Sequence, residues 1–156
     1  MSWQDYVNYL LQDNICESAH IMGIDGTLWA SSTGLNQLPE YDLDVPSDQD
    51  PEKKVKVKVQ ERETLLKAIS NNGVPSGPAG LRLNNQKFYS VNFDGERRTW
   101  YLKKEKGGAC ICITGKAIVF ATFCTDLKMA NQVSQNAGEC NKRVETLASS
   151  LLQAGY

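Results

Sequence analysis

The sequence has little of what most catalytic and metal sites require. Histidine occurs once, as His20, so a cysteine–histidine nucleophile would need this one residue to meet a distant cysteine. CxxC, HExxH, GxGxxG and GxxxxGK[ST] motifs are absent, and the aspartates between residues 42 and 50 do not follow a calcium-loop pattern. The sequence therefore predicts no enzyme, with no catalytic residue, no metal and no cofactor.

Net charge and long apolar runs are also scarce. The formal net charge is −1 at pH 7, which gives no overall attraction to nucleic acid. No stretch approaches the roughly 20 apolar residues that span a bilayer, and Asp5 and Asp13 interrupt the N-terminal apolar pattern, so no secretory signal is expected. A length of 156 residues fits one domain over residues 1–156, and we expect it in the cytoplasm.

The number and spacing of the cysteines also indicate the cytoplasm. Their odd number and wide spacing predict reduced thiols rather than a disulfide framework: Cys16, Cys110, Cys112, Cys124 and Cys140. Cys110 and Cys112 are two residues apart in a strand-like run, so both are expected on one face as small apolar side chains.

Three segments have helical patterns. Residues 3–13 form an amphipathic stretch, and Ser2 with Asp5 resembles a capping box. Residues 61–71 form a second stretch, which Asn72-Gly73 would end in a left-handed conformation. Asn136 with Glu139 predicts the start of a final helix that ends at Gly155.

The other apolar runs predict strands. Ala19–Ile24 and Thr27–Ser31 flank Asp25-Gly26, a dipeptide that favours a type I′ turn. Five later runs follow, of which the last two are nearly all apolar and should be central: 81–83, 87–93, 99–103, 109–114 and 117–123.

Residues 36–59 differ from the rest. Four aspartates and three prolines predict an exposed loop over residues 36–54. Lys54–Val59 alternates lysine and valine, which is typical of a strand at a sheet edge with one face in water. The order of helices and strands predicts an α+β fold with a central antiparallel β-sheet.

Five segments, in the right order, are similar to the profilin family: Ser2–Tyr6, Gly26–Ala30, Gly80–Phe88, Gly107–Ala109 and Leu147–Tyr156. The resemblance covers nearly the whole chain. It implies that the N- and C-terminal helices pack on one face of the sheet and a further short helix on the other. The acidic loop and Lys-Val strand at roughly 40–59 depart from short profilins, and this insertion before the middle helix resembles divergent, protist-type members.

The resemblance implies a cytoskeletal protein that binds monomeric actin, regulates its polymerisation and binds proline-rich proteins such as formin-type nucleation factors. Aromatic rings can stack on proline rings while indole N–H and phenol O–H groups donate to the free carbonyls of a polyproline helix. The implied poly-proline groove consists of Trp3, Tyr6, Trp29, Leu151 and Tyr156.

The resemblance also implies two polar surfaces. The residues carried over to actin binding are Lys87, Tyr89, Lys104, Gly138, Asn141 and Lys142. A basic run is expected to contact phosphatidylinositol bisphosphate at the membrane surface: Arg97, Arg98, Lys103, Lys104 and Lys106. Asn92 and Glu145 depart from the family pattern on the actin face, where a basic residue and an aromatic residue are common.

One alternative fits the same pattern. A different α+β interaction module, of the adaptor or sensory type, would bury Trp3, Trp29 and Tyr156 as ordinary core residues. Trp3 and Tyr6 at helical spacing are typical of a packed face as well as of a ligand site. The two interpretations differ in whether the rings face solvent.

Overall fold

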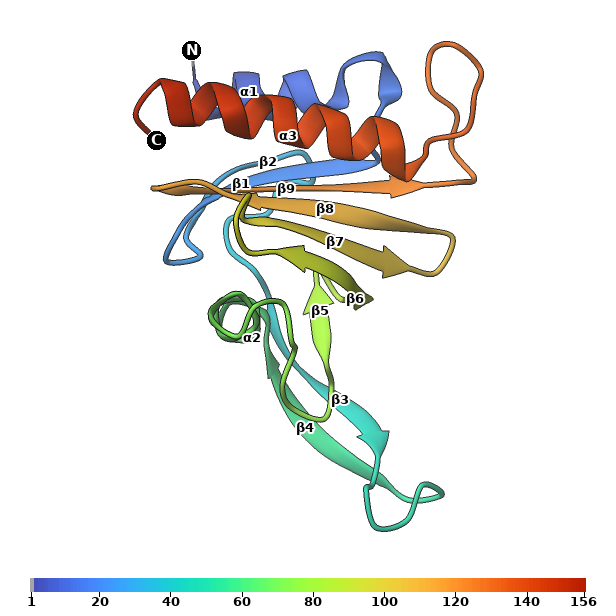
Figure 1. Cartoon of the computed structure of the whole chain (residues 1–156). Coiled ribbons are helices and arrows are strands. Elements are labelled where there is room, and N and C mark those ends of the chain that lie inside the picture. Colours follow the sequence, from blue (N-terminus) through green and yellow to red (C-terminus); the bar gives the residue numbers. More distant parts are fainter. Residues whose placement is uncertain (1) are drawn as a thin grey trace.

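The computed structural model describes residues 2–156 and confirms the α+β fold. Within that range the main sheet has the strand order β2-β1-β9-β8-β7-β6-β5, with antiparallel neighbours. Figure 1 shows α1 and α3 side by side on one face of this sheet and α2 on the other side. The elements are α1 (Trp3–Leu11), a 3₁₀ turn (Gln12–Asn14), β1 (Ser18–Gly23), β2 (Leu28–Ser31), β3 (Glu40–Pro46), β4 (Lys54–Gln60), α2 (Glu61–Ser70), β5 (Leu81–Leu83), β6 (Gln86–Asp94), β7 (Thr99–Lys104), β8 (Gly107–Ile113), β9 (Ala117–Cys124) and α3 (Ala137–Gln153).

The sheet separates two apolar cores. Alternate residues of the central strands β8 and β9 face opposite sides, so each strand contributes to both cores. Cys110 and Cys112 lie on the side of α1 and α3, as their spacing predicted. Trp100 and Phe120 lie on the side of α2. The expectation that β8 and β9 are central and covered on both faces is confirmed.

The helix ends follow the predicted local signals. The Ser2 side chain accepts a hydrogen bond from the Asp5 N–H while the Asp5 carboxylate accepts from the Ser2 N–H, which completes the capping box. Asn136 accepts from the Glu139 N–H at the start of α3. After α2, Asn72 and Gly73 both have positive φ, at 54° and 84°.

The turn prediction at Asp25-Gly26 was wrong. Gly26 has a φ of 82°, but Asp25 is not in the left-handed region, and the Gly26 N–H bonds to the Gly23 carbonyl. The connection from β1 to β2 is therefore a longer loop, because β2 begins only at Leu28. A two-residue turn with positive φ at both positions joins β5 to β6 instead, at Asn84 (50°) and Asn85 (59°).

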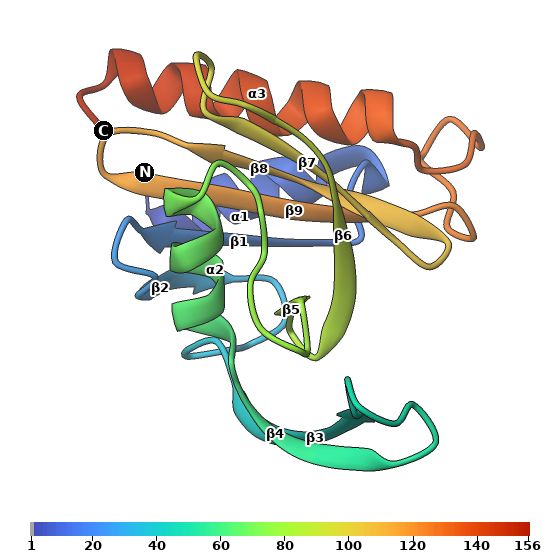
Figure 2. The ribbon, with the colours of Figure 1, turned by 60° about the horizontal axis from the view of Figure 1, so that its bottom comes forward.

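The loop prediction for residues 36–54 was also wrong over its central part. Glu40–Pro46 forms β3, which pairs in register with β4 as a separate two-stranded ribbon. In this register Asp42 lies opposite Lys58 and Asp44 lies opposite Lys56, and the one ion pair within the described residues 40–60 joins Lys58 to Glu40 at 3.9 Å. Figures 1 and 2 show this ribbon projecting away from the main sheet, and we refer to residues 40–60 as the arm.

Candidate functional site

The aromatic residues from the two ends of the chain meet at one place. The Trp3 ring centroid lies 5.5 Å from Tyr6, 4.7 Å from Trp29 and 5.0 Å from Tyr156. Trp29 and Tyr156 are 38% and 40% exposed, and Trp3 and Tyr6 are half-buried. These four residues, which we call the aromatic cluster, therefore present ring surface to solvent rather than filling the core.

An irregularity in β2 places Trp29. Ile21 pairs with Ala30 and Met22 with Leu28, so Trp29 is the extra residue of a β-bulge. A bulge redirects a side chain out of the regular alternation, and here it brings the indole against Trp3. Gly23 makes room for the ring, because a Cβ at that position would lie 2.9 Å from the Trp29 ring. Neither the bulge nor the role of Gly23 was expected from the sequence.

Tyr156 is held through its main chain. Its main-chain oxygen accepts from the Lys116 N–H at 2.6 Å and from the Thr114 hydroxyl at 2.9 Å. Both donors belong to the turn between β8 and β9. This turn therefore fixes the backbone while the phenol ring packs edge-on against Trp3.

Leu151 does not line the aromatic surface. It is 1% exposed and packs in the core beneath α1 and α3, so the expected contact with a ligand is corrected. Leu151 lies on the same helical face as Val144, Leu147 and Ala148, and that periodicity was visible in the sequence. Its role is to support the helix that carries the end of the chain.

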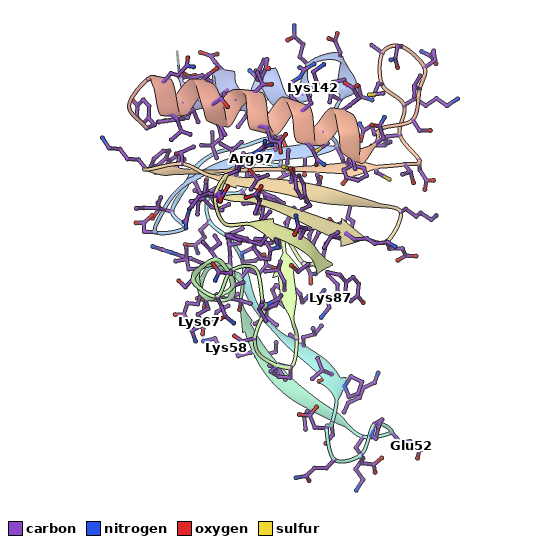
Figure 3. The ribbon with its side chains drawn as sticks, viewed as in Figure 1. Glu52, Lys58, Lys67, Lys87, Arg97 and Lys142 are labelled. Atoms are coloured by element: carbon purple, nitrogen blue, oxygen red, sulfur yellow. The ribbon has the colours of Figure 1, made fainter. Side chains whose placement is uncertain are left out.

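The residues expected to bind actin divide between two faces of the sheet. Tyr89 on β6 is 61% exposed and lies directly opposite Lys103 on β7. On the same side, a surface cavity of about 390 Å³ lies between β7 and α3; its lining includes Tyr101, Gly138, Asn141 and Lys142. The hydroxyl of Tyr101 donates to Glu145, and this bond raises the pKa of the phenol. Figure 3 shows Lys142 on α3 and Lys87 near β5 and β6.

Lys104 lies on the α2 side of β7 and is almost completely buried in an ion pair. It is 6% exposed, and its Nζ lies 2.5 Å from Glu17, whose carboxylate also accepts from Thr122. Trp100 and Leu102 share that side of β7. Lys104 is therefore corrected to a structural residue, and the strand alternation makes Lys103 the exposed lysine of β7 on the α3 side.

Lys87 is only partly available. Its Nζ donates to the carbonyl of Ala79 at 2.8 Å and lies 5.6 Å from the centre of the Tyr89 ring. Partial burial lowers the pKa of the Lys87 ammonium. Both residues line a second cavity, of about 550 Å³, at this end of the sheet, and the Lys104–Glu17 pair forms part of the same lining.

The predicted phosphoinositide site does not form a single patch. Arg97 and Arg98 precede β7 and Lys106 follows it, and six residues of strand separate them by roughly 20 Å at about 3.3 Å per residue. Lys106 pairs with Asp126 at 3.4 Å, and Lys104 is buried. The run is dense in sequence but dispersed in space.

His20 has a structural environment. The imidazole is 1% exposed, stacks on Phe120 with a centroid distance of 5.2 Å and contacts the Ser31 hydroxyl through Nδ1 at 2.8 Å. Burial lowers the pKa of His20 from 6.5 to about 4. The five cysteines are free, and Cys16 and Cys140 approach each other to 3.8 Å between sulfur atoms.

Residues 2–156 contain no cluster of three or more potential metal ligands. None of the helices in that range combines the length and apolar character needed to cross a bilayer.

Comparison with known proteins identifies similar chains. The family model described as Profilin matches residues 1–156. Profilin of Tetrahymena pyriformis is 46% identical over 157 residues, covering 99% of this chain and 98% of that relative. Among solved structures, Acanthamoeba castellanii profilin IA gives a TM-score of 0.69 at 24% identity, covering 99% of this chain and 100% of its own. Mouse profilin IIa gives a TM-score of 0.61 at 18% identity and covers both chains completely.

Proposed function

The chain belongs to the profilin family, and from that premise we propose that it binds monomeric actin, regulates actin polymerisation and binds proline-rich ligands without being an enzyme. Family membership favours this function over an adaptor or sensory module. We further infer that residues 1–156 act as one domain in the cytoplasm, in association with the actin cytoskeleton.

The observation that carries the poly-proline proposal is the exposed aromatic cluster. Trp3 contacts three other rings, and two of those rings are more than a third exposed. Proline rings stack on such surfaces, and a polyproline II helix is already extended, so little conformational entropy is lost on binding. Mouse profilin IIa was solved in complex with a double repeat from the FH1 domain of mDia1, which supports the same use of the fold here.

Titration with poly-L-proline tests this proposal. Trp3 and Trp29 lie in the aromatic cluster, so tryptophan fluorescence should change saturably. Trp3→Ala should weaken binding by roughly 30-fold or more, since a central aromatic residue of an interface typically contributes about 2 kcal/mol or more. Far-UV circular dichroism of the variant checks that it is folded.

A matched variant makes the poly-proline test specific. Tyr89→Ala removes an exposed ring from β6, away from the aromatic cluster, and should leave poly-proline affinity unchanged. A wild-type protein with no saturable response, or a folded Trp3→Ala variant with unchanged affinity, would contradict the proposal.

For actin, we propose the surface that runs from β6 across β7 to the start of α3. It contains Tyr89, Lys103, Gly138, Asn141 and Lys142, with Lys87 at its margin. Exposed lysines there can attract acidic groups of a partner and accelerate association. LokiProfilin2, solved in complex with rabbit actin, shares the fold with a TM-score of 0.58 at 16% identity, which supports a role of this kind.

Pyrene-actin polymerisation tests the actin proposal. The wild-type protein should slow spontaneous nucleation by sequestering monomers, and Lys103→Glu with Lys142→Glu should weaken this effect severalfold. Lys67→Glu with Lys128→Glu is the matched control, because it reverses the same number of exposed charges elsewhere. If the wild-type protein leaves nucleation unchanged at a large excess over actin, the proposal that it binds actin monomers is wrong.

A further inference from the structure

The arm leaves a strand edge uncovered. Among residues 2–156, β4 pairs with β3 and with no other strand, so the outer edge of β4 has no strand beside it. Figures 1 and 2 show that the main sheet and its helices do not fold over the arm. Main-chain N–H and C=O groups that point outward from an edge strand are able to pair with an added strand.

The side chains of β4 carry a regular charge pattern. Lys54, Lys56 and Lys58 alternate with Val55, Val57 and Val59, so the lysines share one face of the arm. Within the described part of the chain, the one carboxylate within 4.0 Å of these lysines is that of Glu40, 3.9 Å from Lys58. Lys54 lies opposite Pro46, and Lys56 lies opposite Asp44 without an ion pair within 4.0 Å, so both ammonium groups can accept a further carboxylate.

The chain itself contains an example of a strand that fits β4. In β3, acidic residues alternate with apolar ones, and each aspartate lies opposite a lysine in the observed register. On the other face, Leu43 lies opposite Val57 and Val45 opposite Val55. Carboxylates at alternate positions with apolar residues between them are thus the pattern that matches both faces of β4.

The root of the arm is fixed, so the edge is presented in one orientation. Glu61 is fully buried, and its carboxylate accepts from the Tyr41 hydroxyl and from the N–H groups of Asn84 and Asn85 at 2.5–2.8 Å. Arg82 donates to the Tyr41 hydroxyl at 3.1 Å. These bonds attach the base of β3 to the turn between β5 and β6, and a preorganised edge loses less entropy on binding.

We propose that the outer edge of β4 binds an extended segment of a partner protein in which acidic and apolar residues alternate, added as a third strand of the arm. The lysines make this edge selective. A second β4 strand from another copy, added with the same face outward, would place lysine beside lysine, whereas an acidic strand neutralises the charge. The strand β3 of another copy carries such an acidic pattern, and the oligomeric state tests that occupant. This binding site is separate from the aromatic cluster and from the surface proposed for actin.

The probe is a short synthetic peptide of alternating glutamate and valine with blocked ends, titrated into ¹⁵N-labelled full-length protein. Amide resonances of residues 54–60 should shift saturably, while those of Trp3, Trp29 and Tyr156 should not. Raising the salt concentration should weaken binding severalfold, because the contributing charges are exposed. A peptide of the same composition with its glutamates and valines in two blocks should bind at least roughly tenfold more weakly, since it cannot match the alternation.

Charge reversal tests the residues. Lys54→Glu with Lys56→Glu should weaken binding of the acidic peptide at least roughly tenfold and create affinity for a peptide of alternating lysine and valine. Lys67→Glu with Lys128→Glu is the control with the same net charge change and should bind like the wild type. Amide resonances of residues 40–60 that keep their dispersion show that the arm of each variant is folded, and unchanged poly-L-proline affinity shows that the main sheet is folded.

Three results would overturn the proposal. One is equal binding of the alternating and the block peptide, which would indicate nonspecific attraction to lysines. The second is a set of shifted amides that lies outside β4. The third is a wild-type protein that sediments as an oligomer and is monomeric when Lys54 and Lys56 are reversed, because a second copy would then occupy the edge.

Discussion

The aromatic cluster and the arm are built in opposite ways. The cluster takes Trp3, Trp29 and Tyr156 from three segments that are far apart in the sequence, joined by α1, β2 and the end of the chain after α3. The arm is one continuous stretch whose two strands pair with each other. The cluster therefore depends on the complete sheet and its core, whereas the arm depends on local pairing and on its attachment through Glu61.

The comparison shows why the two regions should respond differently to mutation. Leu10 and Val144, in the core beneath α1 and α3, are 0% exposed, while Val55 in the arm is 47% exposed. Isolated two-stranded ribbons are marginally stable in water, so the arm gains its order from its root rather than from a core of its own. Changes in the core should affect the whole molecule, and changes in the arm should stay local.

The largest expected effect is that of a cavity in the core beneath α1 and α3. Leu10→Ala should lower the free energy of unfolding by about 2–5 kcal/mol, because it removes a fully buried side chain from the core of α1 and α3. Urea denaturation measures this change. Val55→Ala is the control in the arm and should cost less than about 1 kcal/mol. Equal losses would show that the arm is part of the same cooperative unit.

The second effect is a pH dependence confined to the main sheet. Burial lowers the pKa of His20 to about 4, against 6.5 for a free imidazole, so the unfolded state binds a proton first as the pH falls. Stability should fall between pH 6.5 and about 4, by about 2 kcal/mol at about pH 5. Urea unfolding at several pH values measures how the free energy of unfolding changes with pH, and His20→Gln should remove this dependence. A slope that persists in His20→Gln would assign it to other groups.

The third effect is local to the arm. Glu61→Ala leaves the Asn84 and Asn85 N–H groups without their acceptor, at a cost of about 1–3 kcal/mol. Hydrogen exchange should accelerate in the turn between β5 and β6 and in β4, while poly-proline affinity stays within about twofold of the wild type. Glu63→Ala, an exposed residue of the same helix, should change neither. A loss of poly-proline binding in Glu61→Ala would show that the arm and the aromatic cluster belong to one cooperative unit.

The smallest effect is at the start of α1. Ser2→Ala removes the side-chain acceptor for the Asp5 N–H and should cost about 1 kcal/mol. Because α1 carries Trp3 and Tyr6, poly-proline affinity should fall slightly, whereas the protection of the arm amides from hydrogen exchange should stay unchanged. Thermal unfolding and hydrogen exchange measure the two responses.

Local signals predicted most of the fold. The capping residues, the helical periodicities and the apolar runs were readable because each depends on neighbours within a few residues. The strand β3 was missed because its aspartates and proline are typical of loops, and its order depends on pairing with β4 and on the attachment through Glu61. The turn at Asp25-Gly26 was wrong because the following strand begins later than the apolar pattern indicated.

The family resemblance predicted which aromatic residues come together, but it did not predict the direction of several other side chains. Alternation along β7 would have assigned Lys104 to the side of Trp100 and Leu102, and helical spacing would have assigned Leu151 to the core. The bulge that turns Trp29 toward Trp3 had no sequence signal. The face on which a residue lies within a regular strand or helix could thus be predicted from the sequence, whereas the register shift in β2 could be found only in the structure.

The distribution of the thiols has a practical consequence. Four of the five cysteines are buried, and Cys124 alone among them is partly accessible, at the cavity shared with Lys87 and Lys106. A maleimide dye should therefore attach at a single position in the native protein without mutagenesis. Such a reporter would sit beside the surface proposed for actin and away from Trp3, which makes the two kinds of ligand separately observable in one sample.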